Sequence, residues 1–137
     1  MRDILFRGKT YNDKWVQGLL VQMDDHLTQI RKLGSDGIGY YDYSIVPSTV
    51  GQYTGLTDKN GKKIFEGDII KIFPDCDYLD DYNFSKIYSY NGIFCVDYHG
   101  DDFDSTALGF LEDYNPDCDY EVIGNIHDNP ELLEVAK

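Results

Sequence analysis

The sequence has few cysteines and no long apolar run, and each shortage excludes a class of protein. Three cysteines in 137 residues are few and odd in number, which fits a reducing compartment better than a secreted disulfide scaffold. No apolar run is long enough to span a membrane, and the first residues lack the apolar stretch of a signal peptide. We therefore expect a cytoplasmic protein without a membrane partner.

Common catalytic and metal-binding motifs are also missing. The sequence contains no G-x-S-x-G, no H-E-x-x-H and no C-x-x-C, so nothing indicates the usual hydrolase or zinc sites. One string, Pro-Asp-Cys-Asp-Tyr, occurs twice, at 74–78 and 116–120. It could mark a shared cation site or a Cys76–Cys118 bond, but we favour chance in a chain rich in Asp and Tyr. We expect no catalytic residue, no metal site and no cofactor.

Acidic residues are abundant and unevenly distributed. Their excess gives the chain a net charge of -13; residues 1–63 carry +2 and residues 64–137 carry -15. A surface this negative repels a phosphate backbone, which disfavours a nucleic-acid partner. A nucleic-acid-binding module stays an alternative only if the basic residues cluster away from the acidic half; these residues are Arg2, Arg7, Lys9, Lys62 and Lys63.

The residue pattern predicts a mainly β protein. Twelve Tyr residues favour strands over helices, and turn residues separate many short apolar stretches. Residues 15–23 are predicted to form a strand, with Trp15, Leu19, Val21 and Met23 on one face, that pairs with residues 26–32. The Asn60-Gly61 pair is the strongest turn signal, typical of a type I′ hairpin.

These strands predict a short-stranded meander followed by a small SH3-like barrel, with one or two short helices. We expect a single compact domain, 1–137, or two subdomains within it. The subdomains would be an N-terminal β-meander over residues 1–55 and a small β-barrel over residues 56–137. An acidic loop is expected within the barrel at residues 73–89.

Three segments carry a family resemblance. They are Phe6-Arg7-Gly8-Lys9 with Lys14-Trp15-Val16, then Thr49 to Leu56 with Asp58 to Ile69, and finally Glu121 to Ile126 with Asn129 to Leu132. In this order they resemble the YopX family of bacteriophage and prophage proteins. The resemblance implies a phage-encoded, β-rich protein of the bacterial host cytoplasm. It implies no assigned activity and offers no catalytic residues.

The motifs also supply the candidate binding residues, which are Arg7, Trp15, Gln52, Tyr53, Thr54, Asp68 and Asn125. The aromatic members, Trp15 and Tyr53, are expected to anchor packing. The polar members could form a ligand pocket, or they could satisfy buried backbone groups at the corners of the fold. We favour the second, structural role.

The sequence therefore predicts a non-enzymatic phage or prophage accessory protein that acts through protein binding or self-assembly. An acidic metal-dependent or hydrolytic enzyme module is the alternative from a different class. The uneven charge predicts a homo-oligomer in which the basic part of one copy contacts the acidic part of the next.

Overall fold

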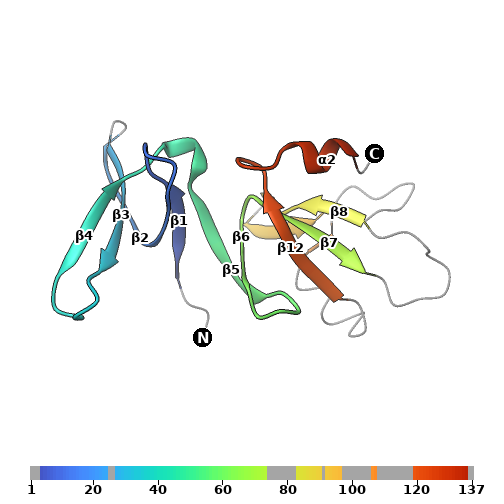
Figure 1. The fold of residues 1–137 in the computed structure, drawn as a ribbon, viewed down its shortest axis with the longest axis horizontal. Helices are drawn as coiled ribbons and strands as arrows, with labels where there is room; N and C mark the ends of the chain where they lie inside the picture. The colour runs from blue at the N-terminus through green and yellow to red at the C-terminus, as the bar shows by residue number, and fades with distance from the viewer. Residues whose placement is uncertain are drawn as a thin grey trace. The chain divides into compact units, whose positions relative to one another are not determined.

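The computed structural model describes residues 4–24, 27–73, 83–90, 92–96, 106–107 and 119–135, and these residues are mainly β-strand (Figure 1). The chain divides into two compact units, Met1–Gly55 (unit 1) and Leu56–Lys137 (unit 2). The predicted mainly β class is confirmed. In the described part of the chain, no helix has both the length and the apolar character needed to cross a membrane.

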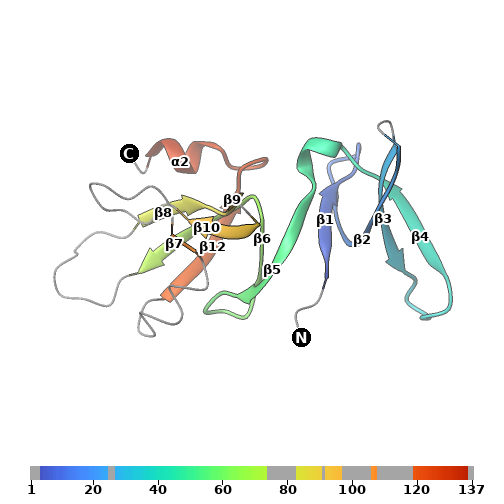
Figure 2. The ribbon, with the colours of Figure 1, turned by 180° about the vertical axis from the view of Figure 1, so that it is seen from behind.

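Unit 1 is an antiparallel sheet in which the first four strands form a meander and the fifth pairs with the first, and Figures 1 and 2 show it from both sides. In sheet order its strands are β4 (Tyr40–Ser44), β3 (Leu27–Leu33), β2 (Trp15–Asp24), β1 (Phe6–Lys9) and β5 (Gly51–Thr57). The last two residues of β5 belong to unit 2, and a short 3-10 helix, η1 (Pro47–Thr49), leads from β4 toward β5. The predicted hairpin of β2 and β3 is confirmed.

The sheet of unit 1 curls, because the end of β1 approaches the segment that follows β4. Thr10 and Ile45 form an isolated antiparallel bridge, and the N–H of Val46 donates to the carbonyl oxygen of Lys9 at 2.9 Å. A Cβ atom at Gly8 would lie 2.3 Å from Ile45 Cγ2. This close approach is the reason that position 8 requires glycine.

Val16, Ile30 and Ile45 form the core of unit 1. Trp15, Leu19 and Val21 share one face of β2, but Val16 of the opposite face is buried while Leu19 is 55% exposed. The apolar parity of β2 therefore does not mark the face that forms the core of this unit. Trp15 lies instead beneath two basic side chains of β1, described below.

The described part of unit 2 contains two three-stranded antiparallel sheets. One has the order β12 (Asp119–Asn125), β7 (Asp68–Phe73), β8 (Asn83–Lys86), and the other β11 (Thr106–Ala107), β10 (Ile93–Val96), β9 (Tyr88–Tyr90). Strand β6 (Lys63–Phe65) neighbours β5, and helix α2 (Glu131–Val135) follows β12. The described strands of this unit do not close into a barrel.

Two sequence predictions in unit 2 need correction or lie outside the described residues. The acidic loop was expected over residues 73–89, but residues 83–86 and 88–90 form β8 and β9. Ser85 and Ile87 are buried there, so this part of the stretch belongs to the core rather than to a loop. Residues 74–78 and 116–118 of the repeated string lie outside the described residues.

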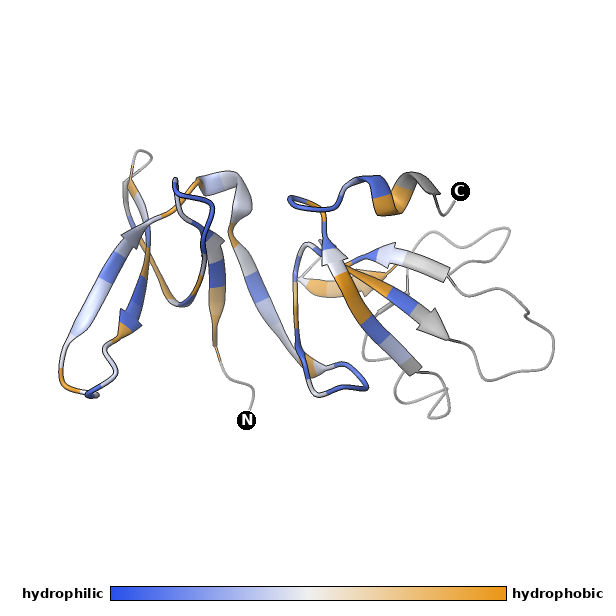
Figure 3. Ribbon diagram, in the orientation of Figure 1, coloured by the Kyte–Doolittle hydropathy of each residue, from blue (hydrophilic) through white to orange (hydrophobic). Residues whose placement is uncertain are grey.

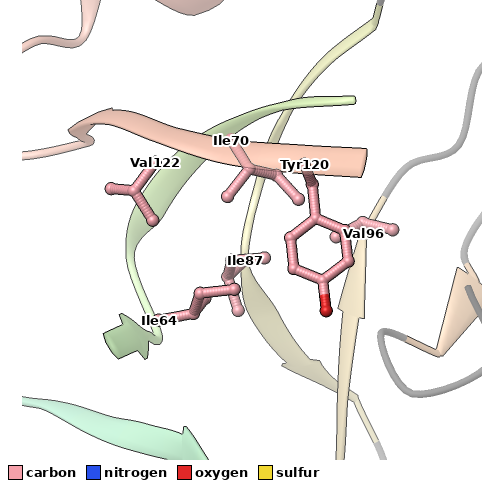
Figure 4. Packing of buried hydrophobic residues seen from close by; sticks show 6 residues of the cluster. All are labelled: Ile64, Ile70, Ile87, Val96, Tyr120 and Val122. Atoms are coloured by element: carbon pink, nitrogen blue, oxygen red, sulfur yellow. The ribbon is translucent and has the colours of Figure 1, made fainter. Parts of the chain in front are cut away.

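Aliphatic side chains from several strands meet in the core of unit 2. Figure 4 shows the side chains of this cluster pointing toward one another: Ile64, Ile70, Ile87, Val96, Tyr120 and Val122. Figure 3 shows the corresponding apolar segments in the middle of β7, β10 and β12. Each fully buried Ile stabilises the fold by about 1.5–3 kcal/mol relative to an exposed one. Packing across strands therefore holds this unit together.

The hairpin between β5 and β6 is tight, but its turn is not type I′. Gly61 has a φ of +81°, whereas Asn60 has no positive φ, and type I′ requires a positive φ at both central residues. Asp58 N–H donates to Lys62 O at 2.8 Å and Gly61 N–H donates to Asp58 O at 2.9 Å. This pattern is a type I turn followed by a left-handed glycine. The Asp58 carboxylate accepts the Asn60 N–H at 2.9 Å, which holds Asn60 in the ordinary conformation.

Candidate functional site

Strand β4 is the exposed edge of the unit 1 sheet. It pairs with β3 on one side and is the last strand in the sheet order. All five of its residues are exposed, and Tyr40, Tyr41 and Tyr43 have exposed fractions of 56%, 62% and 38%. Edge strands are usually protected from pairing with another chain by charged residues or proline, and tyrosine gives no such protection. We call residues Tyr40–Ser44 the β4 edge.

Hydrogen bonds at both ends of the β3–β4 hairpin reveal which backbone groups of β4 face outward. The N–H of Ile45 donates to Thr28 O at 3.0 Å, and the N–H of Gly34 donates to Gly39 O at 2.7 Å. Hydrogen-bonded pairs alternate along an antiparallel ladder, so odd-numbered residues of this stretch face β3. The N–H and C=O groups of Tyr40, Asp42 and Ser44 therefore face away from β3. Next to Ser44, Thr10 of the same chain bridges Ile45, so an added strand would bind at Tyr40 and Asp42.

A groove lies between the β1–β2 turn and the last residues of β4. It has a volume of about 390 Å³ and is lined by residues of the β1–β2 turn, by Lys14 and Val16, and by Asp42, Tyr43 and Ser44. The turn contributes Thr10, Tyr11 and Asn12. The groove thus adjoins Asp42, one of the two open positions of the edge, while Tyr40 does not line it. An extended segment that pairs with β4 would place side chains in it.

The side chain of Arg31, on β3, contacts the side chains of both residues whose backbone groups face outward, Tyr40 and Asp42. Its guanidinium carbon lies 4.1 Å from the ring centroid of Tyr40. Its Nε and Nη2 donate to the two carboxylate oxygens of Asp42 at 2.9 and 3.1 Å. These hydrogen bonds hold the pKa of Asp42 below its ordinary value and raise the pKa of Arg31. The β4 edge therefore presents a paired carboxylate, with its charge compensated, rather than a lone acid.

Five of the seven predicted site residues belong to unit 1, where they pack around β1. The guanidinium carbon of Arg7 lies 4.7 Å from the ring centroid of Trp15, and Lys9 Nζ lies 5.8 Å from it. Gln52 pairs with Phe6 across β1 and β5. Tyr53 and Thr54 are buried, and Tyr53 N–H donates to a carbonyl oxygen before β1 at 2.7 Å. These residues therefore contact other strands and side chains within unit 1.

The other two predicted residues, Asp68 and Asn125, belong to unit 2 and lie opposite each other on β7 and β12. Asp68 is 1% exposed and accepts the N–H of Phe65 at 2.8 Å. Asn125 accepts the N–H groups of His127 and Asp128 at 3.0 and 2.9 Å. Both side chains bind backbone donors at turns, which is a common use of buried or capping polar groups.

Sequence reasoning missed Asp58 as a key polar residue of unit 2. One carboxylate oxygen accepts the N–H groups of Asn60 and Lys62, both at 2.9 Å, and the other accepts the N–H of Val122 at 2.9 Å. Burial raises the pKa of Asp58, but these backbone hydrogen bonds outweigh burial, and the net pKa lies below its ordinary value. The turn signal at 58–61 indicated the local bonds, but nothing in the sequence indicated the bond to β12.

The described residues offer little other chemistry. In these ranges no three His, Cys, Asp or Glu side chains gather closely enough to hold a metal ion. Cys95 is buried, with its Sγ 3.5 Å from the carbonyl oxygen of Ile93. The exposed β4 edge and its groove are the strongest candidate site in the part of the chain that the structure describes.

The fold places the protein in a class of mainly β proteins with two units, one of which presents an open edge strand. The family model described as YopX protein matches residues 5–134. The chain therefore belongs to the YopX family, as the motifs in the sequence predict.

Two solved structures support this membership. Protein EF1440 from Enterococcus faecalis is 26% identical, with a TM-score of 0.59, and the match covers 97% of this chain and 99% of that one. Protein yopX from Bacillus subtilis is 21% identical, with a TM-score of 0.64 and the same two coverages. No curated protein matches the chain. The likeness concerns the fold and extends over both units.

Proposed function

We propose that the protein is a non-enzymatic accessory protein of a phage or prophage that works in the host cytoplasm by binding protein. The binding surface is the β4 edge, to which an extended segment adds as a further strand. Main-chain hydrogen bonds supply much of the affinity in this mode of recognition, and pockets for alternate side chains supply specificity. The observation that carries the proposal is the pair of outward-facing backbone positions, Tyr40 and Asp42, beside a groove.

The distribution of exposed apolar side chains supports this surface. All but one of the large exposed apolar side chains among the described residues belong to unit 1, and the exception is Ile93. Three of them are the tyrosines of β4. Tyrosine is enriched at protein interfaces because it combines apolar area with a polar group and loses little entropy when fixed.

The packing of Arg7 and Lys9 argues against nucleic-acid binding through the first strand. Both cations lie over the Trp15 ring, and Lys9 Nζ also lies 3.6 Å from a carboxylate oxygen of Asp13. A phosphate-binding surface needs cations that are exposed and available. The proposal therefore keeps protein, and not nucleic acid, as the partner.

Two substitutions at one position separate backbone pairing from side-chain effects. Asp42→Pro removes an N–H that faces away from β3, which an edge strand tolerates. Asp42→Ala also loses the contact to Arg31 but keeps this N–H. We expect Asp42→Pro to weaken association with protein about tenfold more than Asp42→Ala, a difference of about 1.4 kcal/mol.

The measurement combines light scattering of the purified protein with capture from a bacterial host extract. Ile93→Lys, an exposed apolar position of unit 2, serves as a control that should associate like the wild type. The proposal fails if the Asp42→Pro protein, with an unchanged melting temperature, retains every association of the wild type. It also fails if the wild-type protein associates with no protein, itself included.

A further inference from the structure

We propose that the strand added to the β4 edge comes from a second copy of this chain, related to the first by a twofold axis at Tyr41. This inference rests on the proposed function, since it names the partner of the same edge. The contact is isologous, so it closes as a dimer. It differs from the head-to-tail contact of basic and acidic parts that the sequence predicts.

Charge favours unit 1 as the meeting surface of two copies. Unit 1 contains six Lys or Arg and six Asp or Glu residues, so the entire net charge of -13 belongs to unit 2. Two copies that meet through unit 1 therefore bring together surfaces without net charge. At the edge itself, Arg31 compensates the carboxylate of Asp42. Like-charge repulsion, the main obstacle to self-association of an acidic protein, is small at this surface.

The open backbone groups select the register of the pairing. Tyr40, Asp42 and Ser44 are the outward-facing positions of β4, but Ser44 adjoins the bridge between Thr10 and Ile45 of its own chain. Tyr40 and Asp42 are therefore the two positions that can pair with an outward-facing position of the second copy. Pairing Tyr40 of one copy with Asp42 of the other uses all these groups and makes four hydrogen bonds across the twofold axis. A shift that centres the axis on Asp42 would pair Tyr40 with Ser44, where Thr10 of the same chain already bridges Ile45 on the outer side of the strand.

The same register gives favourable contacts to the side chains. Tyr41 lies opposite Tyr41 of the second copy in a non-hydrogen-bonded pair, where cross-strand side chains are closest and aromatic pairs stabilise the sheet. Beyond the paired stretch, residue 38 of the second copy comes near the groove at the end of β4. Ile38 is 88% exposed, and Ser44 lines the groove. The β3–β4 turn of one copy thus brings an exposed isoleucine to the groove of the other.

The paired stretch is short, so the dimer is expected to be weak. Interfaces smaller than the standard size give affinities in the micromolar range or weaker. Added salt should strengthen it, because it screens the repulsion between the acidic second units over distances of about 10 Å at 0.1 M. A dissociation constant of about 10–100 μM near physiological salt is consistent with this geometry.

A charge-swap experiment tests both the partner and the register. Tyr41→Lys and Tyr41→Asp change an exposed side chain and should leave the melting temperature unchanged. Each variant alone opposes two like charges across the axis, so each should dimerise at least about fivefold more weakly than the wild type. A fluorescently labelled Tyr41→Lys protein should bind unlabelled Tyr41→Asp at least about fivefold more tightly than unlabelled Tyr41→Lys. Ile93→Lys is the matched control.

The outcomes separate this inference from the proposed function. If both variants lose association but the mixture restores none, the β4 edge binds protein and the twofold register is overturned. If Tyr41→Lys is instead rescued by Tyr43→Asp, the axis lies at Asp42, and the register proposed here is wrong. If a wild-type mass of one chain persists to about 1 mM protein, a second copy is not the partner. If neither variant changes any association, both proposals fail.

Discussion

The carboxylate of Asp58 accepts a hydrogen bond from the backbone N–H of Val122 at 2.9 Å, although 64 residues separate the two in the chain. The same side chain accepts two N–H groups of its own turn. Asp58 thereby links the β5–β6 hairpin to β12 within unit 2.

Asp58→Ala should destabilise the protein by about 3 kcal/mol, because it leaves the buried N–H of Val122 and two turn N–H groups without their acceptor. Asp36→Ala is the matched control, since Asp36 accepts the N–H groups of Ile38 and Gly39 in an exposed turn. We expect it to cost less than about 1 kcal/mol. Urea unfolding of both variants measures the difference, and equal losses would show that Asp58 does not link the strands.

Stability should fall in acid partly through the same carboxylate. The pKa of Asp58 is lower in the folded protein than its ordinary value, since three backbone donors outweigh burial. A depressed folded pKa contributes stability above the unfolded pKa, about 3.9, and this contribution is lost as the pH falls through the folded pKa. We expect constant stability above about pH 5 and a decline below about pH 4. The decline should be shallower in Asp58→Ala, and an identical acid profile would contradict this role.

Gly61 tests the corrected turn. Its φ of +81° is strained for any residue with a side chain, and most of all for a β-branched one. Gly61→Val should cost about 1–3 kcal/mol, although no atom would clash with the new Cβ. Gly39 also has open space around it but no positive φ, so Gly39→Val should cost much less. Thermal unfolding of the two variants checks the prediction, and equal melting temperatures would exclude strain at position 61.

Ile38 tests the groove contact of the proposed dimer. Ile38→Ser changes a side chain that is almost fully exposed, so the stability of a single copy should not change. If Ile38 fills the groove of a second copy, its loss should weaken dimerisation about three- to tenfold. Sedimentation equilibrium measures this, with Ile93→Ser as the control. A dimer as tight as that of the wild type would place Ile38 outside the interface.

Most strands could be predicted from sequence because turn residues mark their ends. The hairpin of β2 and β3 follows from alternation on both sides of an Asp-Asp pair, and the β5–β6 turn follows from Asn60-Gly61. The buried face of β2 could not be predicted. Trp15, Leu19 and Val21 have the parity of a core face, but Arg7 and Lys9 pack over the Trp15 ring, and Val16 faces the interior instead.

The candidate site was harder to predict than the fold. The sequence directed attention to polar residues of the family motifs, such as Asp68 and Asn125, whose hydrogen bonds serve backbone turns. The β4 edge lies outside these motifs, and hydropathy does not mark it as apolar (Figure 3). Its importance depends on the sheet order and on the direction of two backbone groups, which only the pairing of β3 and β4 determines.

Amide hydrogen exchange of β4, followed over a series of protein concentrations, tests the central claim most directly. The N–H groups of Tyr41 and Tyr43 bond to β3, so their protection should not depend on concentration. The N–H groups of Tyr40 and Asp42 face outward, and we predict fast exchange in dilute protein and rising protection as the second strand adds. Exchange at Tyr40 and Asp42 that stays fast at every concentration, while light scattering shows association, would contradict the account.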